Sequence, residues 1–562
     1  GDEQPSPYLF DAARSGPGRF LADALIKSKP AVHKRRMLKP LHRTPEFCAA
    51  CHKVSLDRPV NGYRYLRGQD EYDHWLASGV AHGSAATFYL PPEPKRCQDC
   101  HMPYIPARLP DVSSRNGRIR SHLFLAVNDA LPHLRGDDEM RERIYAFLRD
   151  WKLRVDVFAL EFPGRRVRAL DVSRPVLVAG ETVVFEVVVR NLGVGHTFPG
   201  GTNDSNQAWI EFTITDEDSN VLGRRGWVDE EGYVDRKAHF YRVVFVREDG
   251  TAAMRRDAQN FRAVAYQRVI GPGKADLARY AFPVPAAAVG RKLTIRARLR
   301  WRKFNRDYVK FVFGEQKLPV PDLPRFRGKE IPDLPVTTIA ESSVTLEVAA
   351  DWREPRAVRD PALWERYNDH GIANLEQGAF NVAQESFAGV ARLRPDLPDG
   401  YRNQARRWLR SAAPDRALLL LQKVEEVAPL DPQRSWFWGR YFERTEQFER
   451  SEEAYRDSVD VFPRDREGWR RLGKVRFKLH RYEEALEAYL RLLEIDNEDF
   501  GAHEQRLLIY RLLGRDREAA EAAKAFEKYR PDDLADQWTN EFRRRHPEIN
   551  ESAQARHVYP LD

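Results

Sequence analysis

The chain has 562 residues and a mass of 65.1 kDa, which is enough for three or four domains. Charged residues make up 31% and the mean hydropathy is −0.63, while no stretch approaches the roughly 18 consecutive apolar residues of a transmembrane helix. A hydrophobic content of 42% excludes collagen-like, low-complexity and wholly disordered chains. The net charge of +8 fits an acidic partner or an anionic surface, and we expect neither a nucleic-acid partner nor a transmembrane segment.

All four cysteines belong to two short motifs, so none remains for an ordinary disulfide. The motifs are Cys48-Ala-Ala-Cys51-His52 and Cys97-Gln-Asp-Cys100-His101. The sequence begins at Gly1 and shows no signal-peptide pattern, so we expect that any export signal lies outside the sequence in hand.

Residues 1–150 hold both cysteine motifs, scattered Pro and Gly, and little strand-like alternation. This pattern predicts an extended N-terminal arm, short helices and long loops. Because these make only a weak hydrophobic core, we expect something other than protein side chains to fill the interior of the region. The region is also rich in histidine, with eight of the 15 in the chain: His33, His42, His52, His74, His82, His101, His122 and His133.

A Cys-x-x-Cys-His motif is typical of covalent haem c attachment. The two thiols bind the haem vinyl groups, and the histidine that follows binds the iron from one side. A four-cysteine zinc site is the alternative, but zinc gives no reason for a histidine after each pair. We therefore predict two haem c groups on Cys48, Cys51, Cys97 and Cys100, with His52 and His101 as the proximal iron ligands.

Two segments resemble those of multihaem c-type cytochromes, a family that includes the pentahaem nitrite reductases. The first is Cys97–Pro103 followed by Ser121-His122, and the second is Gly195-His196-Thr-Phe-Pro199-Gly-Gly201, with Gly200 in place of the family's usual threonine. The resemblance implies that His122 and His196 are distal iron ligands, with His42, His133 and His33 as lesser candidates. We expect His74 and His82 to be surface residues.

Residues 151–350 change to short runs of β-branched and aromatic residues separated by turn signals, which predicts an antiparallel, immunoglobulin-like β-sandwich. The clearest predicted strands are Thr182–Arg190, Ala208–Thr215, Lys292–Trp301 and Ser343–Ala349. Five prolines in residues 315–335 predict an extended strap before the last strand.

From about residue 360 a repeat of 34 residues appears, with small residues at 383, 417, 451, 485 and 519 and helix-ending residues at 395, 429, 463, 497 and 531. This register resembles the tetratricopeptide repeat, which implies five helical hairpins over 360–533 and a surface that binds a protein partner. Residues 534–562 then form a capping helix and tail. The predicted fold class is a multidomain α+β protein with a haem-organised N-terminal region, a β-sandwich and a C-terminal α-solenoid.

These features together predict an electron-transfer dihaem cytochrome, bis-His and low-spin, in the periplasm or the extracellular space. Because two haems make only a short relay, we expect redox partner proteins or further copies of the chain in a complex or a haem filament. No phosphate-binding loop or hydrolase motif occurs, so an electron carrier is favoured over an enzyme. The alternatives are a multihaem redox enzyme, such as a reductase of small nitrogen compounds, and a scaffold with structural haems.

Overall fold

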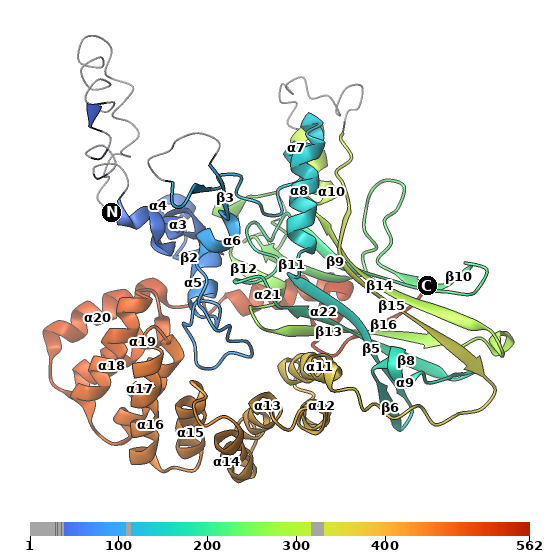
Figure 1. Cartoon of the computed structure of the whole chain (residues 1–562). Helices are drawn as coiled ribbons and strands as arrows, with labels where there is room; N and C mark the ends of the chain where they lie inside the picture. The colour runs from blue at the N-terminus through green and yellow to red at the C-terminus, as the bar shows by residue number, and fades with distance from the viewer. Residues whose placement is uncertain are drawn as a thin grey trace. The chain divides into compact units, whose positions relative to one another are not determined.

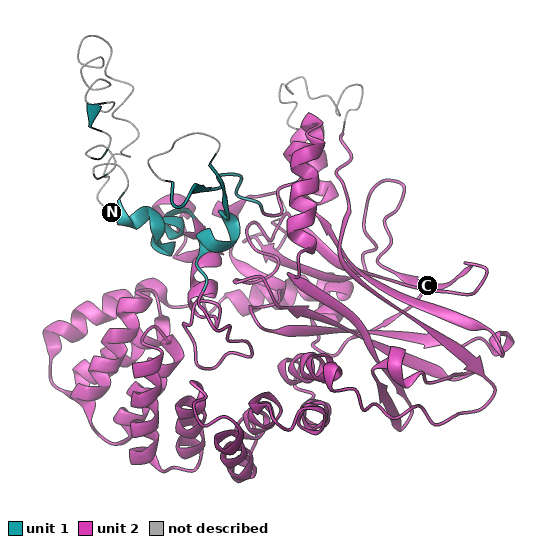
Figure 2. Cartoon of the chain, viewed as in Figure 1, with its two compact units in different colours: residues 1–51, 95–125 teal, residues 52–94, 126–562 magenta. Residues whose placement is uncertain are grey.

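The computed structural model describes residues 28–29, 31, 35, 39–107, 114–253, 255–315 and 331–562 (Figure 1). The chain forms two compact units, one of residues 1–51 and 95–125 and the other of residues 52–94 and 126–562 (Figure 2). The predicted positions of His33 and of most of the 315–335 strap lie outside the described residues. The fold is mixed α+β, as predicted.

The first unit contains the two motif helices and little else. Its elements are a 3-10 turn η2 (Pro40–Arg43), α3 (Pro45–His52, whose last residue belongs to the second unit), α6 (Cys97–His101), and the antiparallel pair β3 (Tyr104–Pro106) and β4 (Arg118–Arg120). Of its described residues, only Pro45, Gln98 and Ser121 are buried. Apart from Pro45, the described residues of the first unit therefore bury no apolar side chain, which agrees with the weak core expected from the sequence.

The second unit begins with a small segment that leads into the sheets. Its elements are β1 (Lys53–Leu56), α4 (Arg58–Asn61), β2 (Leu66–Asp70), α5 (Glu71–Leu76), α7 (Ala130–Arg135) and α8 (Asp138–Arg149). β1 and β2 form an antiparallel pair, and Asp70 caps α5 by accepting a hydrogen bond from the Asp73 amide at 3.0 Å.

Two sheets make up the middle of the second unit. One has the order β16-β13-β8-β5-β6 and the other the order β12-β11-β9-β14-β15-β7, with β10 paired to β9. The strands are β5 (Leu153–Phe162), β6 (Arg165–Arg168), β7 (Leu177–Val178), β8 (Thr182–Asn191), β9 (Gln207–Thr215), β10 (Val221–Arg225), β11 (His239–Val246), β12 (Ala263–Arg268), β13 (Ala275–Pro283), β14 (Lys292–Arg302), β15 (Thr337–Ala349) and β16 (Val558–Pro560). Short helices α9 (Leu170–Ser173) and α10 (Arg306–Lys310) lie between strands.

Both sheets contribute to one hydrophobic core. Phe185 and Tyr280 come from the five-stranded sheet, and Phe212, Ile295 and Trp301 come from the other. Phe212 stacks on Tyr280 with ring centroids 4.2 Å apart. The alternation of β-branched and aromatic residues therefore faces a shared interior, and the four predicted strands are confirmed, although β15 begins six residues earlier than expected.

Five helical hairpins follow within residues 364–529, in the predicted 34-residue register. The helices are α11 (Trp364–Glu376), α12 (Phe380–Leu393), α13 (Pro398–Leu409), α14 (Leu418–Val427), α15 (Arg434–Arg444), α16 (Phe448–Val461), α17 (Arg466–Lys478), α18 (Tyr482–Ile495), α19 (Phe500–Leu512) and α20 (Asp516–Tyr529). A glycine on the first helix lies against an aromatic ring on the second. A Cβ at Gly371 would lie 2.5 Å from Phe387, and one at Gly439 would lie 2.7 Å from Tyr455. Glycine is needed there because the ring fills the space of a side chain.

Both ends of the helical array contact the sheets. At the first end, His370 of α11 lies 2.7 Å from Glu186 of β8, and Gln377 donates to the Leu277 carbonyl of β13 at 2.8 Å. At the other end, α21 (Ala535–Arg545) packs Phe542 against β11 and β12, and α22 (Pro547–Ala553) follows. The tail then adds β16 parallel to β13, so residues 534–562 form two helices after the last repeat and one strand of the five-stranded sheet.

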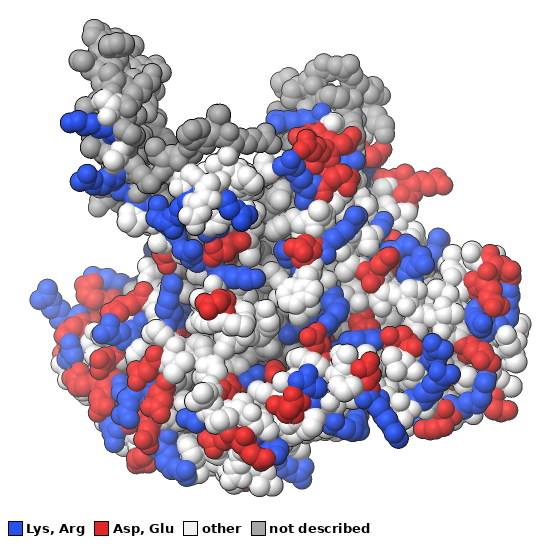
Figure 3. Space-filling model, viewed as in Figure 1, with Lys and Arg blue, Asp and Glu red and all other residues white. Residues whose placement is uncertain are grey.

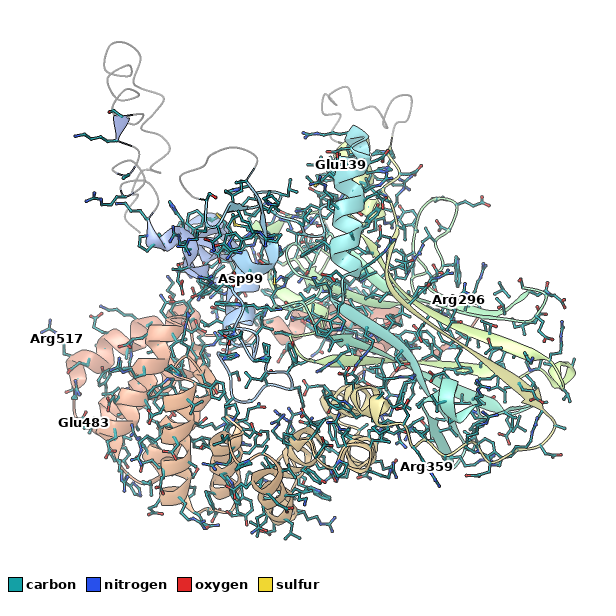
Figure 4. The ribbon with its side chains drawn as sticks, viewed as in Figure 1. Asp99, Glu139, Arg296, Arg359, Glu483 and Arg517 are labelled. Carbon is teal, nitrogen blue, oxygen red and sulfur yellow. The ribbon has the colours of Figure 1, made fainter. Side chains whose placement is uncertain are left out.

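The described surface carries both signs of charge. Figure 3 shows Lys and Arg interspersed with Asp and Glu over the visible face. The outer helices carry many of these residues, and Figure 4 labels Glu483 of α18 and Arg517 of α20 at the edge of the array. Among the described residues, no helix is both long enough and apolar enough to cross a membrane.

Candidate functional site

The two motif helices of the first unit are joined by side-chain contacts. The Gln98 amide of α6 donates to the Thr44 carbonyl at 2.8 Å, and its nitrogen lies 3.7 Å from the Cys48 sulfur of α3. Arg96, just before α6, donates to the Arg43 carbonyl at 3.2 Å. These contacts bring the first cysteine of each motif to the same place.

The β3–β4 pair holds the second motif from the other side. Arg120 of β4 donates to the Gln98 and Met102 carbonyls at 2.9 and 3.0 Å, and the Gln98 carbonyl also accepts the Met102 amide hydrogen that ends α6. Its other nitrogen donates to Asp99 at 2.6 Å, and Asp99 is labelled in Figure 4. The arginine therefore fixes α6 although the helix has only five residues.

The thiols of Cys48 and Cys97 are in contact. The hydrogen bond with Cys48, together with burial, raises the pKa of Cys97 well above its usual value. None of the four cysteines is in a disulfide. Among the described residues, which include all four cysteines, no three His, Cys, Asp or Glu side chains are grouped so as to hold a bare metal ion.

Both predicted proximal histidines direct the same ring nitrogen at an oxygen. His101 Nδ1 lies 2.8 Å from the Leu125 carbonyl, within the first unit. His52 Nδ1 lies 3.2 Å from Glu71 Oε2, within the second. A neutral imidazole that donates from Nδ1 carries its lone pair on Nε2, and metal-binding histidines are commonly oriented in this way. The two motifs share this arrangement although their acceptors differ.

The two leading distal candidates show the same orientation. His122 Nδ1 lies 3.1 Å from the Arg120 carbonyl, and the side chain is exposed. His196 Nδ1 lies 2.9 Å from the Thr197 carbonyl, and burial lowers the pKa of His196 below its usual value. A lowered pKa favours the neutral imidazole, which is the form that binds metals.

Glu71 joins the His52 and His196 segments within the second unit. One of its oxygens lies near His52 Nδ1, and the other accepts the Gly201 amide hydrogen. A Cβ on Gly200 would lie 2.9 Å from His196 Cε1 and 3.4 Å from Glu71, so only glycine leaves room for both side chains.

Sequence reasoning missed Glu71 because nothing local marks it. Glu71 begins α5, and it meets His52 and the 195–201 loop only after β1 and β2 fold back on each other. Thr197 also links the 195–201 loop to α5, since its hydroxyl lies 3.0 Å from His74 Nδ1. The acidic first turn of α5 was the one available signal, and it is also an ordinary helix-start feature.

The lesser candidates have different surroundings. His42 packs edge-on against Phe47, with ring centroids 4.9 Å apart. His133 Nε2 donates to the Asp333 carbonyl at 3.1 Å, and its Nδ1 accepts from Arg141 at 3.2 Å. His74 is exposed, as expected, whereas His82 is half-buried and its Nε2 lies 2.7 Å from the Pro91 carbonyl.

Apolar side chains are exposed around the motif helices. The exposed fractions in the first unit are 43% for Phe47, 38% for Tyr104, 40% for Ile105, 39% for Leu123 and 55% for Phe124. Such a grouping in a unit without a buried apolar core is typical of a surface that contacts another apolar body.

Comparison with known proteins identifies the repeats. Residues 438–500 match the tetratricopeptide repeat family, which confirms that part of the prediction. A structure of MamA from Desulfovibrio magneticus is 18% identical, covering 33% of this chain and 96% of its own, with a TM-score of 0.26. A structure of PilF from Pseudomonas aeruginosa is 13% identical, covering 34% of this chain and 96% of its own, with a TM-score of 0.29. No curated protein matches the chain.

Proposed function

We propose that the chain binds two haem c groups, one through Cys48 and Cys51 and the other through Cys97 and Cys100, and that it transfers electrons. Once bound, haem supplies reversible one-electron chemistry at its iron. The observation that carries the proposal is the shared orientation of His52 and His101, each with Nδ1 at an oxygen acceptor. An imidazole that donates from Nδ1 to such an acceptor has its Nε2 lone pair available for iron.

The packing of the first unit supports the same proposal. A region this small needs disulfides, a metal or another bound group when its own apolar core is insufficient. Its four cysteines form no disulfide, and its apolar side chains, such as Phe47 and Phe124, face outward. A porphyrin on each motif helix supplies the missing apolar contact.

Because the Cys48 and Cys97 thiols are in contact, the two proposed haem groups would be attached at neighbouring sulfur atoms. The proposed distal ligands are His122 and His196, which makes both irons bis-His and low-spin. On this proposal the protein resembles the multihaem cytochromes, and its two sheets are an immunoglobulin-like sandwich. It acts in the periplasm or outside the cell, where haem is attached to cysteine thiols. Its partners are redox proteins or further copies of itself.

The test is haem content and spin state of the purified full chain, expressed with a c-type haem attachment system. We expect two haems per chain in a pyridine haemochrome assay, an intact mass that includes both, and a low-spin spectrum that cyanide and nitrite leave unchanged. Zinc in place of haem would contradict the proposal. One high-spin iron that accepts these ligands would favour the redox enzyme instead.

The distal assignment predicts that His196→Ala converts one of the two irons to high spin. His122→Ala is expected to convert the other iron in the same way. His133→Ala is the matched control, since His133 Nε2 already donates to the Asp333 carbonyl. Electron paramagnetic resonance of the oxidised protein measures the outcome, and unchanged low-spin spectra for both site variants would contradict the distal assignment.

A further inference from the structure

Residues 84–88 of the second unit have the sequence Ser-Ala-Ala-Thr-Phe. They lie against α13, α15 and α17, each the first helix of its hairpin, and hydrogen bonds to their backbone hold them there. Gln433, at the start of α15, donates to the Ala85 and Thr87 carbonyls at 2.5 and 2.9 Å. Arg406 of α13 donates to the Ala86 and Thr87 carbonyls at 2.6 and 2.8 Å. The Ala85 amide donates to Asp465, at the start of α17, at 2.9 Å. Three consecutive repeats therefore contact one short peptide.

The side chains of this peptide are as closely fitted as its backbone. Ala85 has no exposed surface and belongs to the same core as Ala405 and Phe437 of the repeats. Phe88 is 8% exposed, and the Arg406 guanidinium lies 4.2 Å from its ring centroid. The contact surface thus accepts a small residue at one position and an aromatic residue three positions later.

The repeat register shows that Asp465 is specialised for this contact. Asp431, Asp465 and Asp499 occupy the same position in successive repeats. Asp431 pairs with Arg402, and Asp499 pairs with Arg470, in each case an arginine 29 residues earlier. The corresponding residue before Asp465 is Trp436. Among the described residues Asp465 forms no ion pair, and its buried carboxylate accepts the peptide amide instead.

The loop that presents the peptide is also fixed in shape. A Cβ at Gly79 would lie 1.9 Å from the Tyr89 carbonyl oxygen, and one at Gly83 would lie 1.7 Å from that of Leu76. Both glycines therefore allow close backbone contacts that any other residue would prevent.

We infer that α13, α15 and α17 form a peptide-binding groove whose ligand is residues 84–88 of the same chain, so that protein partners bind the repeats on another surface. The groove selects a short peptide that turns at its second and third positions, where this chain has alanine, and that carries an aromatic residue at its fifth. The repeats then serve to hold the segment between the two cysteine motifs. The inference does not depend on haem binding.

The test uses the full chain and a labelled synthetic peptide of residues 80–92. In the wild type the chain's own segment has a high effective concentration, so the peptide is expected not to bind. Ala85→Arg places a long charged side chain where no space exists, ejects the segment and opens the groove to the peptide. Adding Arg406→Ala should abolish that binding. Ala77→Arg, at an exposed position earlier in the segment, is the control that leaves the groove filled.

Hydrogen exchange provides the second measurement in case Ala85→Arg does not fold. Gln433→Ala removes two hydrogen bonds, so exchange of the amides in residues 84–88 is expected to accelerate roughly tenfold or more, while the rest of the repeats stays protected. The inference is overturned if the peptide binds wild type and Ala85→Arg equally, if a folded Ala85→Arg variant does not bind it, or if Gln433→Ala leaves exchange unchanged.

Discussion

Replacing both Cys97 and Cys100 by serine is expected to reduce the covalent haem content from two groups per chain to one. Serine has the same size but forms no thioether, so the second attachment point is lost. The first motif lies on its own helix, α3, and keeps both of its thiols. Pyridine haemochrome absorbance per chain and the intact mass measure the change.

The reciprocal variant, with Cys48 and Cys51 replaced, is expected to lose the other haem and keep the one on α6. Met102→Leu is the control, because it changes the residue next to the second motif without touching a thiol or an imidazole. Retention of two covalent haems by either double variant would contradict the assignment of the motifs.

Tyr559→Ala is expected to destabilise the second unit by about 3–5 kcal/mol, as for other large aromatic residues removed from a core. Tyr559 is 1% exposed, belongs to the core shared by both sheets, and lies 5.6 Å from Tyr280 between ring centroids. Its hydroxyl accepts from Arg268 at 3.1 Å, so the substitution also leaves a half-buried arginine without that partner.

Urea unfolding followed by intrinsic fluorescence measures this loss. Leu430→Ala is the control, because Leu430 is 93% exposed and its removal leaves every core intact. A midpoint for Tyr559→Ala equal to that of the control would show that β16 does not support the sheet. For the same reason, removal of residues 360–562 is expected to damage the sheets, because it takes away both β16 and the α11 contacts.

The sequence allowed prediction of the elements whose signal is local. The 34-residue register predicted all five hairpins, because small residues recur at fixed positions, and in three of the repeats a glycine such as Gly371 lies against a ring such as that of Phe387. The four strands were placed by their β-branched and aromatic runs. The two cysteine motifs were marked by spacing alone, and the structure puts each on a helix.

What could not be predicted depends on contacts between distant residues. Ala85 and Ala86 carry no signal in the sequence, because the repeats contact their backbone and require only small side chains there. β16 has three residues, too few for a periodic pattern, and it pairs with a strand almost 280 residues earlier. Glu71 and Gly200 belong to the His52 and His196 surroundings only because separate loops meet, which no local pattern encodes.

The attachment of the helical array at both ends changes how it is expected to lose structure. Repeat arrays ordinarily fray from their termini, because a terminal repeat has one neighbour instead of two. Here α11 meets β8 and β13, α21 meets β12, and residues 84–88 bridge three hairpins in between. Neither terminus is then a weak point, and melting of the array becomes coupled to melting of the sheets as a single cooperative transition.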